Sequence, residues 1–137
     1  MILVDSSAWV EFDRATGSPV DRALTELIAG NGPIAVTEPV VMEVCAGAKS
    51  AARENDLRRL LLRFPLARFD AVTDFNGAVT IYRACRRAGV TPRGLLDCMI
   101  AAVALRGGHT VLAQDRDLDQ VARVIRLTMH PASLAPD

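Results

Sequence analysis

The chain has 137 residues, half of them hydrophobic, so it is long enough for one packed domain and too short for two. Its formal net charge is zero, which argues against a generally basic nucleic-acid-binding protein, and no apolar run reaches the roughly 18 residues that span a bilayer. Because no basic segment or cleavage site precedes the strand-like run Ile2–Val4, we expect a cytoplasmic protein without a membrane segment.

Strand-like and helix-like segments alternate from end to end, a pattern typical of a parallel sheet with helices packed on its faces. Strands are expected at residues 2–4, 34–36, 66–72, 110–113 and 124–127. Helices are expected from Ser6 or Ser7 onward, over 20–29, after Thr37, over 53–63, from Thr73 to Gly89, over 95–105 and over 115–121. The predicted fold class is therefore α/β, as one domain over residues 1–137.

Helix ends are predicted from residues that satisfy or interrupt the backbone. Ser6 or Ser7 can cap the first helix, and Thr37 and Thr73 can cap later ones, because a hydroxyl oxygen accepts bonds from free amide groups. Gly30 stops the second helix. The three cysteines lie far apart in helical patterns and form none of the close pairs that zinc sites use, so we expect reduced core residues.

Four acidic residues lie at or near the carboxyl ends of predicted strands or on the helices that follow: Asp5, Glu43, Asp97 and Asp115. The carboxyl ends of parallel strands meet at one edge of a sheet, so these side chains are expected to lie close together. Asp97 also lies in the first turn of an almost uniformly apolar helix, where a charge needs a partner. Gathered carboxylates repel one another unless a cation lies among them, so the pattern indicates a metal site.

Each acid alone has an ordinary structural explanation. Asp5 can cap the helix that follows it, Glu43 can be a solvated helix residue, and Asp97 can interact with a helix amino terminus alone. The run Asp115–Asp119 lies at a helix start, where acids are favoured regardless of function, and for Asp119 we prefer that explanation. Only the coincidence of four such acids on one predicted edge favours a shared site.

Oxygen ligands without histidine or thiolate favour magnesium, which manganese can replace, over zinc or copper. Such a site suits phosphoryl chemistry, because a divalent ion lowers the pKa of a water and stabilises a leaving oxygen. Neither His109 nor His130 lies in a motif, so a histidine general base is not expected.

Four segments carry a resemblance to a known family: ILVDSSAWV at the amino terminus, the glutamate in TEPVVMEV, LLDCMIAAVA, and VLAQDRDLDQVA near the end. In order, spacing and total length, the chain resembles the PIN-domain nucleases, and specifically the VapC-type toxins of bacterial toxin-antitoxin pairs. The fourth segment has Gln114 before Asp115, where the family often has asparagine.

The resemblance implies a three-layer sandwich with a central, mainly parallel five-stranded sheet, and metal-dependent cleavage of RNA, often a structured RNA such as tRNA. It implies that Asp5, Glu43, Asp97 and Asp115 form an acidic quartet that binds the metal and carries catalysis. Asp117 would assist, and Ser7 would support Asp5 by a hydrogen bond, a role compatible with helix capping. The implied partners are a cognate antitoxin and a second copy of the chain, in a homodimer that forms a heterotetramer or larger assembly with the antitoxin.

Attack by a metal-activated water leaves a 5'-phosphate and a 3'-hydroxyl and does not use the 2'-hydroxyl as nucleophile. A preference for RNA must then come from binding contacts, and Arg86, Arg87 and Arg93 are candidates to hold phosphates. The alternative for these arginines is a solvated helix face and loop.

Two other functions are compatible with acids at strand ends. One is a non-catalytic PIN-fold module that binds a protein partner. The other is an aspartate-based phosphotransfer domain, which needs a lysine near the phosphorylated aspartate or an aspartate two residues after the first. Position 7 is a serine and Lys49 is the only lysine, so phosphotransfer is disfavoured.

Overall fold

Three parallel strands form the sheet of the computed structural model, which describes residues 1–134. β1 (Ile2–Val4) lies between β2 (Ile34–Ala35) and β3 (Thr110–Leu112). Ile2 is paired with Ile34 on one side and Thr110 on the other. These short strands are almost wholly buried, which is why they consist of continuous apolar runs without alternation.

The expectation of five strands is wrong, because only three form within the described residues. Leu66 makes a single parallel bridge to Val36, and the chain is helical again from Ala71. The partner strand cannot continue the pairing, since a helix begins two residues after Val36. A short apolar run does not by itself distinguish strand from loop or helix.

The predicted strand 124–127 is also wrong, since Ile125 still belongs to a helix. The chain reaches the sheet only at Met129, which makes one parallel bridge to Val111. Pro131 then opens a short 3-10 helix, Pro131–Leu134, which ends the extended segment. The two bridges therefore flank the three strands at the positions expected for a fourth and a fifth. The last three residues of the predicted domain lie outside the described part of the chain.

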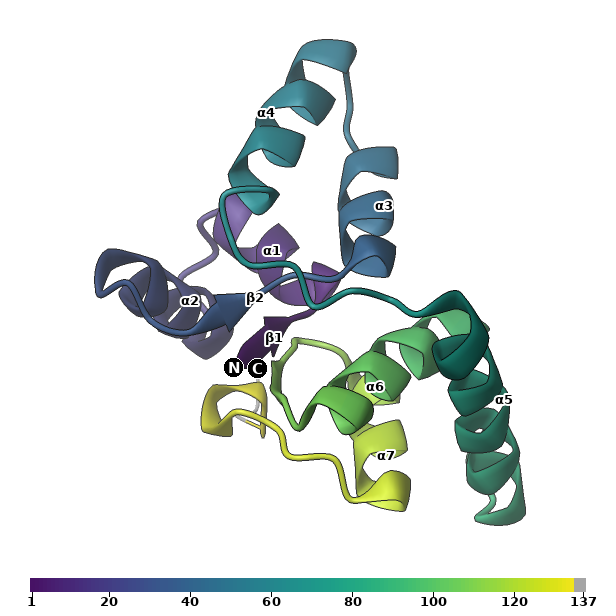
Figure 1. Ribbon diagram of the computed structural model, residues 1–137. Helices are drawn as coiled ribbons and strands as arrows, with labels where there is room; N and C mark the ends of the chain where they lie inside the picture. The colour runs from purple at the N-terminus through teal and green to yellow at the C-terminus, as the bar shows by residue number, and fades with distance from the viewer. Residues whose placement is uncertain (135–137) are drawn as a thin grey trace.

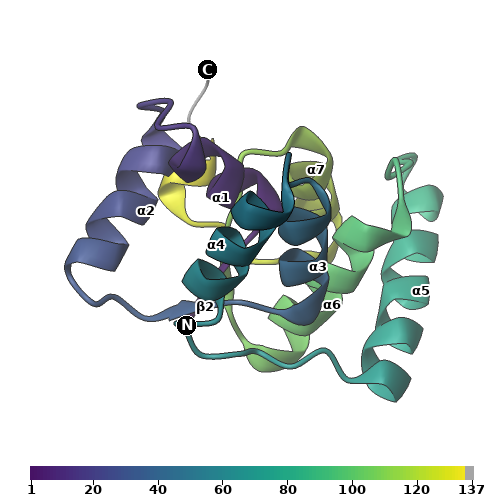
Figure 2. The same cartoon turned by 90° about the horizontal axis from the view of Figure 1, so that it is seen from above.

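Helices lie on both sides of the strands (Figure 1). Their bounds are α1 Ser6–Asp13, α2 Pro19–Ala29, α3 Glu38–Ala46, α4 Ala51–Leu61, α5 Ala71–Arg87, α6 Leu95–Gly107 and α7 Arg116–Ile125. α1 packs against α2 and α3, whereas α5, α6 and α7 pack on one another. Seen from above, α2 and α5 lie at opposite ends of the molecule (Figure 2). Within residues 1–134, no helix is long and apolar enough to cross a membrane.

Aspartates cap two helices for which the sequence suggests hydroxyl caps. Asp5 rather than Ser6 or Ser7 caps α1, and Asp70 caps α5 by accepting a bond from the amide of Thr73. Thr37 lies at the cap position of α3 as expected, but its side chain makes no capping bond. A carboxylate accepts bonds from free amide groups as well as a hydroxyl does, and its negative charge also interacts favourably with the helix amino terminus. When an aspartate and a hydroxyl residue lie close together in the sequence, either can therefore cap the helix.

α6 runs through the core, with one flank covered by α5 and another by α7. Gly108 ends it in the left-handed conformation, at a φ of 67°, which glycine adopts without strain. Cys45, Cys85 and Cys98 are buried and free, as expected of core residues. Burial is also the reason that the pKa of the Cys98 thiol is raised to about 11.

A buried carboxylate joins α5 to α6. Asp74 is only 1% exposed and accepts two bonds from Arg106, from Nε at 2.8 Å and from Nη2 at 2.7 Å. The same Nη2 also donates to the backbone oxygen of Arg68 at 2.8 Å. The guanidinium thus neutralises Asp74 and joins the segment before α5, at Arg68, to the end of α6. It also holds the pKa of Asp74 below its ordinary value.

Replacement of Arg106 with methionine, which keeps the aliphatic stem, is expected to lower the free energy of unfolding by about 2 kcal/mol because Asp74 loses its charged partner. The matched control is Arg123→Met, which breaks the exposed pair with Asp119 and should cost about 0.5 kcal/mol or less. Urea unfolding at neutral pH measures both values. Equal losses in the two variants would contradict a structural role for the Asp74–Arg106 pair.

Candidate metal centre and active site

Two of the predicted acids follow adjacent parallel strands. Asp5 comes directly after β1 and caps α1, while Asp115 lies three residues beyond the end of β3 and caps α7. The amide of Asp5 donates to the backbone oxygen of Leu112 at 2.9 Å, so the carboxyl ends of the two strands are held side by side. The strand ends therefore converge as expected from parallel topology.

Ser7 links these two strand ends. Its Oγ donates to Asp5 Oδ2 at 2.6 Å and accepts a bond from the backbone amide of Gln114 at 2.8 Å. The amide of Ser7 also donates to Asp5 Oδ2 at 3.1 Å, which is the capping bond of α1. The hydrogen bond expected between Ser7 and Asp5 is thus present, and one hydroxyl fixes both the carboxylate and the start of the β3–α7 loop.

Three carboxylates lie close enough to share one cation. Oxygens of Asp97, Asp115 and Asp117 all lie within 4.8 Å of one another, and these three form the acidic cluster. Asp97 comes from the first turn of α6, and the other two come from the start of α7. Asp115 Oδ1 accepts bonds from the amides of Asp117 and Leu118, which fixes its orientation.

Asp5 adjoins the acidic cluster from a buried position. It is 2% exposed, and its Oδ1 has no hydrogen-bond partner among residues 1–134. Burial is the main reason that its pKa is raised to about 6; the charges of Asp115 and Glu43 add to the rise, and the bonds from Ser7 oppose it. A buried carboxylate oxygen without a partner is costly unless a cation or a proton satisfies it.

The pKa of Asp97 is raised further, to about 7. Burial contributes most, followed by the charges of Asp115, Asp5 and Glu43. These acids therefore interact electrostatically, although Asp5 and Glu43 do not belong to the acidic cluster. The four acids named from the sequence do lie in one neighbourhood, with Asp117 added to them.

Glu43 differs from the other three predicted acids. It lies on the exposed side of α3 and is not part of the acidic cluster, although its charge raises the pKa of both Asp5 and Asp97. It lines a cleft of about 710 Å³ together with Asp5 and Asp115. The structure thus brings Glu43 to the edge of the site, across an open space from the cluster.

The predicted basic residues divide between two places. Arg93 lies beside the acidic cluster: its Nε binds Asp117 Oδ2, and its Nη2 lies 3.9 Å from Asp115 Oδ1. Arg86 and Arg87 are exposed in the last turn of α5, and neither lines the cleft. In this structure Arg93 therefore neutralises acids, where the sequence suggested a contact with phosphate.

Basic residues in other segments were missed. Arg14, Lys49 and Arg53 line the same cleft as the acids, from the end of α1, the α3–α4 connection and the start of α4. None belongs to the motifs that carry the acids, and arginine is too common here to single out two of them. The unique lysine was the one available signal.

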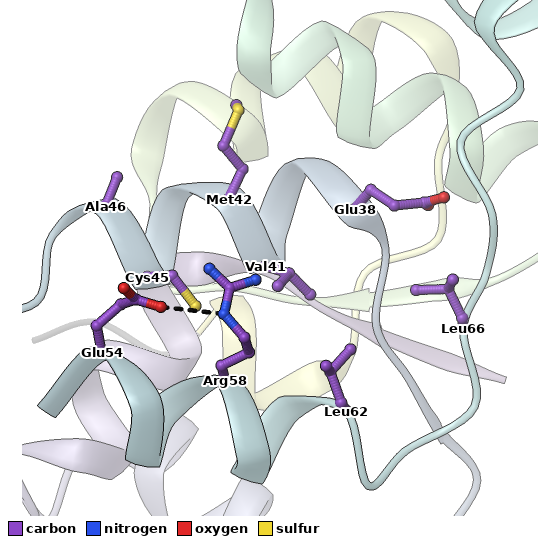
Figure 3. A pocket seen from close by; sticks show the side chains of 9 residues that line it. All are labelled: Glu38, Val41, Met42, Cys45, Ala46, Glu54, Arg58, Leu62 and Leu66. Carbon is purple, nitrogen blue, oxygen red and sulfur yellow. Dashed lines mark hydrogen bonds and ion pairs between the residues drawn. The ribbon is translucent and has the colours of Figure 1, made fainter. Parts of the chain in front are cut away.

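A second groove, of about 580 Å³, lies between α3 and α4 (Figure 3). Its wall is largely apolar, and its one ion pair joins Glu54 to Arg58 within α4 at 3.0 Å. Glu38 is already bound, since it accepts a bond from the amide of Phe69 at 2.7 Å. The exposed side chains of Met42 and Leu62 border it. This groove is largely apolar and contains none of the acids of the acidic cluster.

The donors present fit a hard divalent cation. The acidic cluster offers carboxylate oxygens only, and the unsatisfied Oδ1 of Asp5 lies in the same neighbourhood. Calcium, magnesium and manganese prefer such oxygens, whereas zinc and copper sites usually include histidine or cysteine. A cation there would also remove the repulsion that raises the pKa of Asp97.

Comparison with known proteins agrees with this geometry. Residues 2–124 match the PIN-domain family. The chain is 45% identical over 131 residues to ribonuclease VapC11 of Mycobacterium tuberculosis, covering 93% of this chain and 96% of that protein. It therefore belongs to the PIN-domain family and, within it, to the VapC ribonucleases.

Two solved structures show the shared fold. A chain of VapBC2 from Rickettsia felis, bound to a DNA fragment from their promoter, matches with a TM-score of 0.74 at 20% identity, covering 95% of this chain and 98% of that one. VapC20 of Mycobacterium tuberculosis, a sarcin-ricin loop cleaving toxin, matches with a TM-score of 0.61 at 20% identity, covering 87% and 93%. Both share its PIN-like α/β arrangement with a parallel sheet.

Ser7→Ala is expected to lower the free energy of unfolding by about 1–3 kcal/mol, because the amide of Gln114 loses its acceptor and Asp5 loses its shortest bond. Ser7→Thr keeps the hydroxyl and should retain most of this stability. Urea unfolding of both variants at neutral pH measures the difference. If threonine is as damaging as alanine, the size of the side chain matters here and its hydroxyl does not.

Divalent cations are expected to stabilise the protein more at high pH than at low pH. The pKa of Asp97 is about 7 in the folded protein against an ordinary value of 3.8, so the folded state retains this proton to higher pH than the unfolded state. The free energy of unfolding of the metal-free protein therefore falls as pH rises through that interval. Magnesium binds the ionised carboxylates, so at a pH of about 8 it should raise Tm by roughly 4 °C or more, and at about 5 far less.

Thermal unfolding followed by circular dichroism, with magnesium or with chelator, measures this effect. Asp97→Asn removes one of the repelling charges, so it should raise Tm in chelator at high pH and reduce the response to magnesium. The control is Asp119→Asn, whose carboxylate pairs with Arg123 outside the acidic cluster and whose magnesium response should stay unchanged. A response to magnesium that is independent of pH and of Asp97 would argue against a metal site at this edge.

Proposed function

We propose that this protein is a metal-dependent endoribonuclease and the toxin of a type II toxin-antitoxin pair, built as one PIN domain over residues 1–137. The observation that carries the proposal is the convergence of Asp97, Asp115 and Asp117 beside the buried Asp5 in a chain 45% identical to a VapC ribonuclease. Oxygen ligands at the edge of a parallel sheet suit the hydrolysis of a phosphodiester.

Magnesium is the proposed ion, with manganese as a substitute. Carboxylate oxygens without histidine or cysteine support this choice. A divalent ion held at such a site lowers the pKa of a water and stabilises charge on the phosphate oxygens.

Each acid has a distinct proposed role. Asp97 and Asp115 hold the ion together with the free oxygen of Asp5, and Asp117 assists them. Glu43 faces the cleft from α3, where it can orient the ion's water or the substrate. Ser7 is a positioning residue, because it acts through its bond to Asp5.

RNA is the proposed substrate, in the form of tRNA or another structured RNA in the cytoplasm. Water attacks the phosphorus, the bond from phosphorus to the 3'-oxygen breaks, and that oxygen leaves as a 3'-hydroxyl, so the phosphate stays on the 5'-oxygen. The 2'-hydroxyl takes no part in that step, so recognition of RNA depends on contacts with the fold and sequence of the substrate. The relative VapC20 is a sarcin-ricin loop cleaving toxin, which supports a structured target.

A cognate antitoxin is the proposed partner, and the active form is proposed to be a homodimer that assembles with antitoxin into a heterotetramer or larger complex. The VapBC2 complex from Rickettsia felis supports this assembly, since it contains both components of such a pair. Exposed apolar side chains such as Met42, Leu62 and Phe75 support protein contacts on this chain. Trp9 and Leu57, by contrast, are buried and belong to the core, so they offer no such contact.

Incubation of the purified protein with total cellular RNA tests the activity. Cleavage is expected with magnesium and not with chelator, and the new ends should be 5'-phosphates. Asp97→Asn should slow cleavage by more than about 100-fold, because it removes a central ligand of the site, while Asp119→Asn should cleave normally.

Cleavage that persists in chelator and in Asp97→Asn would exclude the proposed metal chemistry. Absence of cleavage under all conditions, with folded protein, would instead favour a non-catalytic PIN-fold interaction module. A stable phosphoryl group on Asp5 after incubation with a phosphodonor would favour the phosphotransfer alternative.

A further inference from the structure

A cleft of about 710 Å³ opens beside the proposed metal centre, between α1, α3 and α4. Asp5, Glu43 and Asp115 lie on its acidic side. The cleft continues from these acids along the end of α1 to the α3–α4 connection, residues 47–50. It is therefore joined to the site and extends beyond it.

Cationic side chains line the same cleft. Arg53 is bound to Asp13, so this pair is neutral. Arg14 and Lys49 are exposed, line the cleft, and form no ion pair with any residue in 1–134. Two positive charges without an ion-pair partner in residues 1–134 thus line the same cleft as the acids, with Arg14 at the carboxyl end of α1 and Asp5 at its amino end.

The cleft also holds buried polar groups without partners. The hydroxyl of Ser6 and the indole N–H of Trp9 belong to residues that line it, and neither atom has a hydrogen-bond partner within the described residues. Ser6 is 6% exposed and Trp9 is 1% exposed. Residues 1–134 contain five buried side-chain polar atoms without a hydrogen-bond partner. Three of them, including Asp5 Oδ1, belong to residues that line this cleft. Such groups are costly unless a water or another polar group reaches them, so the wall of the cleft is polar as well as charged.

We propose that this cleft binds the RNA backbone, with Arg14 and Lys49 binding phosphates beside the one that is cleaved. The inference rests on the proposed function and names how its substrate is held. A phosphodiester strand needs cations along its length: an ion held by the acids would supply positive charge at the site, and Arg14 and Lys49 supply it elsewhere along the cleft. An arginine and a lysine suit phosphate oxygens without reading sequence.

This proposal assigns the phosphate contacts to residues other than the arginines suggested by the sequence. Arg86 and Arg87 do not line the cleft, and Arg93 is engaged by Asp117 and Asp115. The phosphate contacts are therefore assigned to the α1 end and the α3–α4 connection, on a different part of the fold from α5.

Binding of a fluorescein-labelled single-stranded RNA oligonucleotide, measured by anisotropy over a series of salt concentrations, tests the inference apart from catalysis. Calcium replaces magnesium in one series, and chelator is present in another. Arg14→Gln/Lys49→Gln should bind about tenfold more weakly at low salt, and the slope of log K against log salt should fall by about 1.4 for two lost phosphate contacts. In cleavage assays the same variant should raise KM and leave kcat nearly unchanged.

Two variants complete the design. Arg59→Gln/Arg63→Gln removes two exposed arginines that do not line the cleft, and it should bind RNA like the wild-type protein. Arg14→Lys/Lys49→Arg keeps both positive charges and should bind RNA with an affinity close to that of the wild-type protein. Circular dichroism establishes that each variant is folded.

Unchanged affinity and salt slope in Arg14→Gln/Lys49→Gln, with RNA still bound and cleaved by the wild-type protein, would overturn this inference and leave the proposed function intact. A larger loss in Arg86→Gln/Arg87→Gln would move the phosphate contacts to α5 and overturn it as well. If the wild-type protein neither binds nor cleaves RNA, both the inference and the proposed function fail.

Discussion

The repulsion between carboxylates gathered at one sheet edge is the constraint on which the rest of the structure depends. Asp5 is buried, and Asp97 is partly buried among other acids, so their pKa values are raised to about 6 and about 7. Without a metal ion, this arrangement lowers the free energy of unfolding relative to a sheet edge with uncharged side chains at these positions. Its persistence, supported by the bonds of Ser7 to Asp5 and Gln114, is the strongest physical sign that an ion completes the edge.

The scaffold around the acids is correspondingly rigid. α6 is buried along most of its length and places Asp97 in its first turn, so this carboxylate cannot move away without disturbing the core. Asp115 is fixed by its capping bonds to α7. By contrast, Glu43 and Arg93 are exposed and can change position when an ion or substrate arrives. Carboxylates fixed by a packed helix and by capping bonds thus lie beside exposed charged side chains.

Acidic and basic side chains both line the cleft, although the chain as a whole has a net charge of zero. Asp5 and Arg14 lie at the two ends of α1, and Lys49 lines the same cleft from the α3–α4 connection. Net charge therefore gave little indication of nucleic-acid binding, because the relevant quantity is the local distribution of charge. The apolar groove between α3 and α4 is a separate surface, and it carries none of the residues proposed for chemistry (Figure 3).

The sequence by itself determined the α/β class, the strand at 2–4, the strand at 110–113 to within one residue, and the meeting of Asp5, Asp97 and Asp115. These follow from apolar runs, helix periodicity and parallel topology, which are local or general properties. Tertiary structure decided what depends on partners distant in the chain. It reduced residues 66–72 to a bridge at Leu66, since the adjoining chain turns into α3 and offers no further backbone to pair with. It also brought Lys49 into the cleft of the acids, a proximity that no spacing in the sequence encodes.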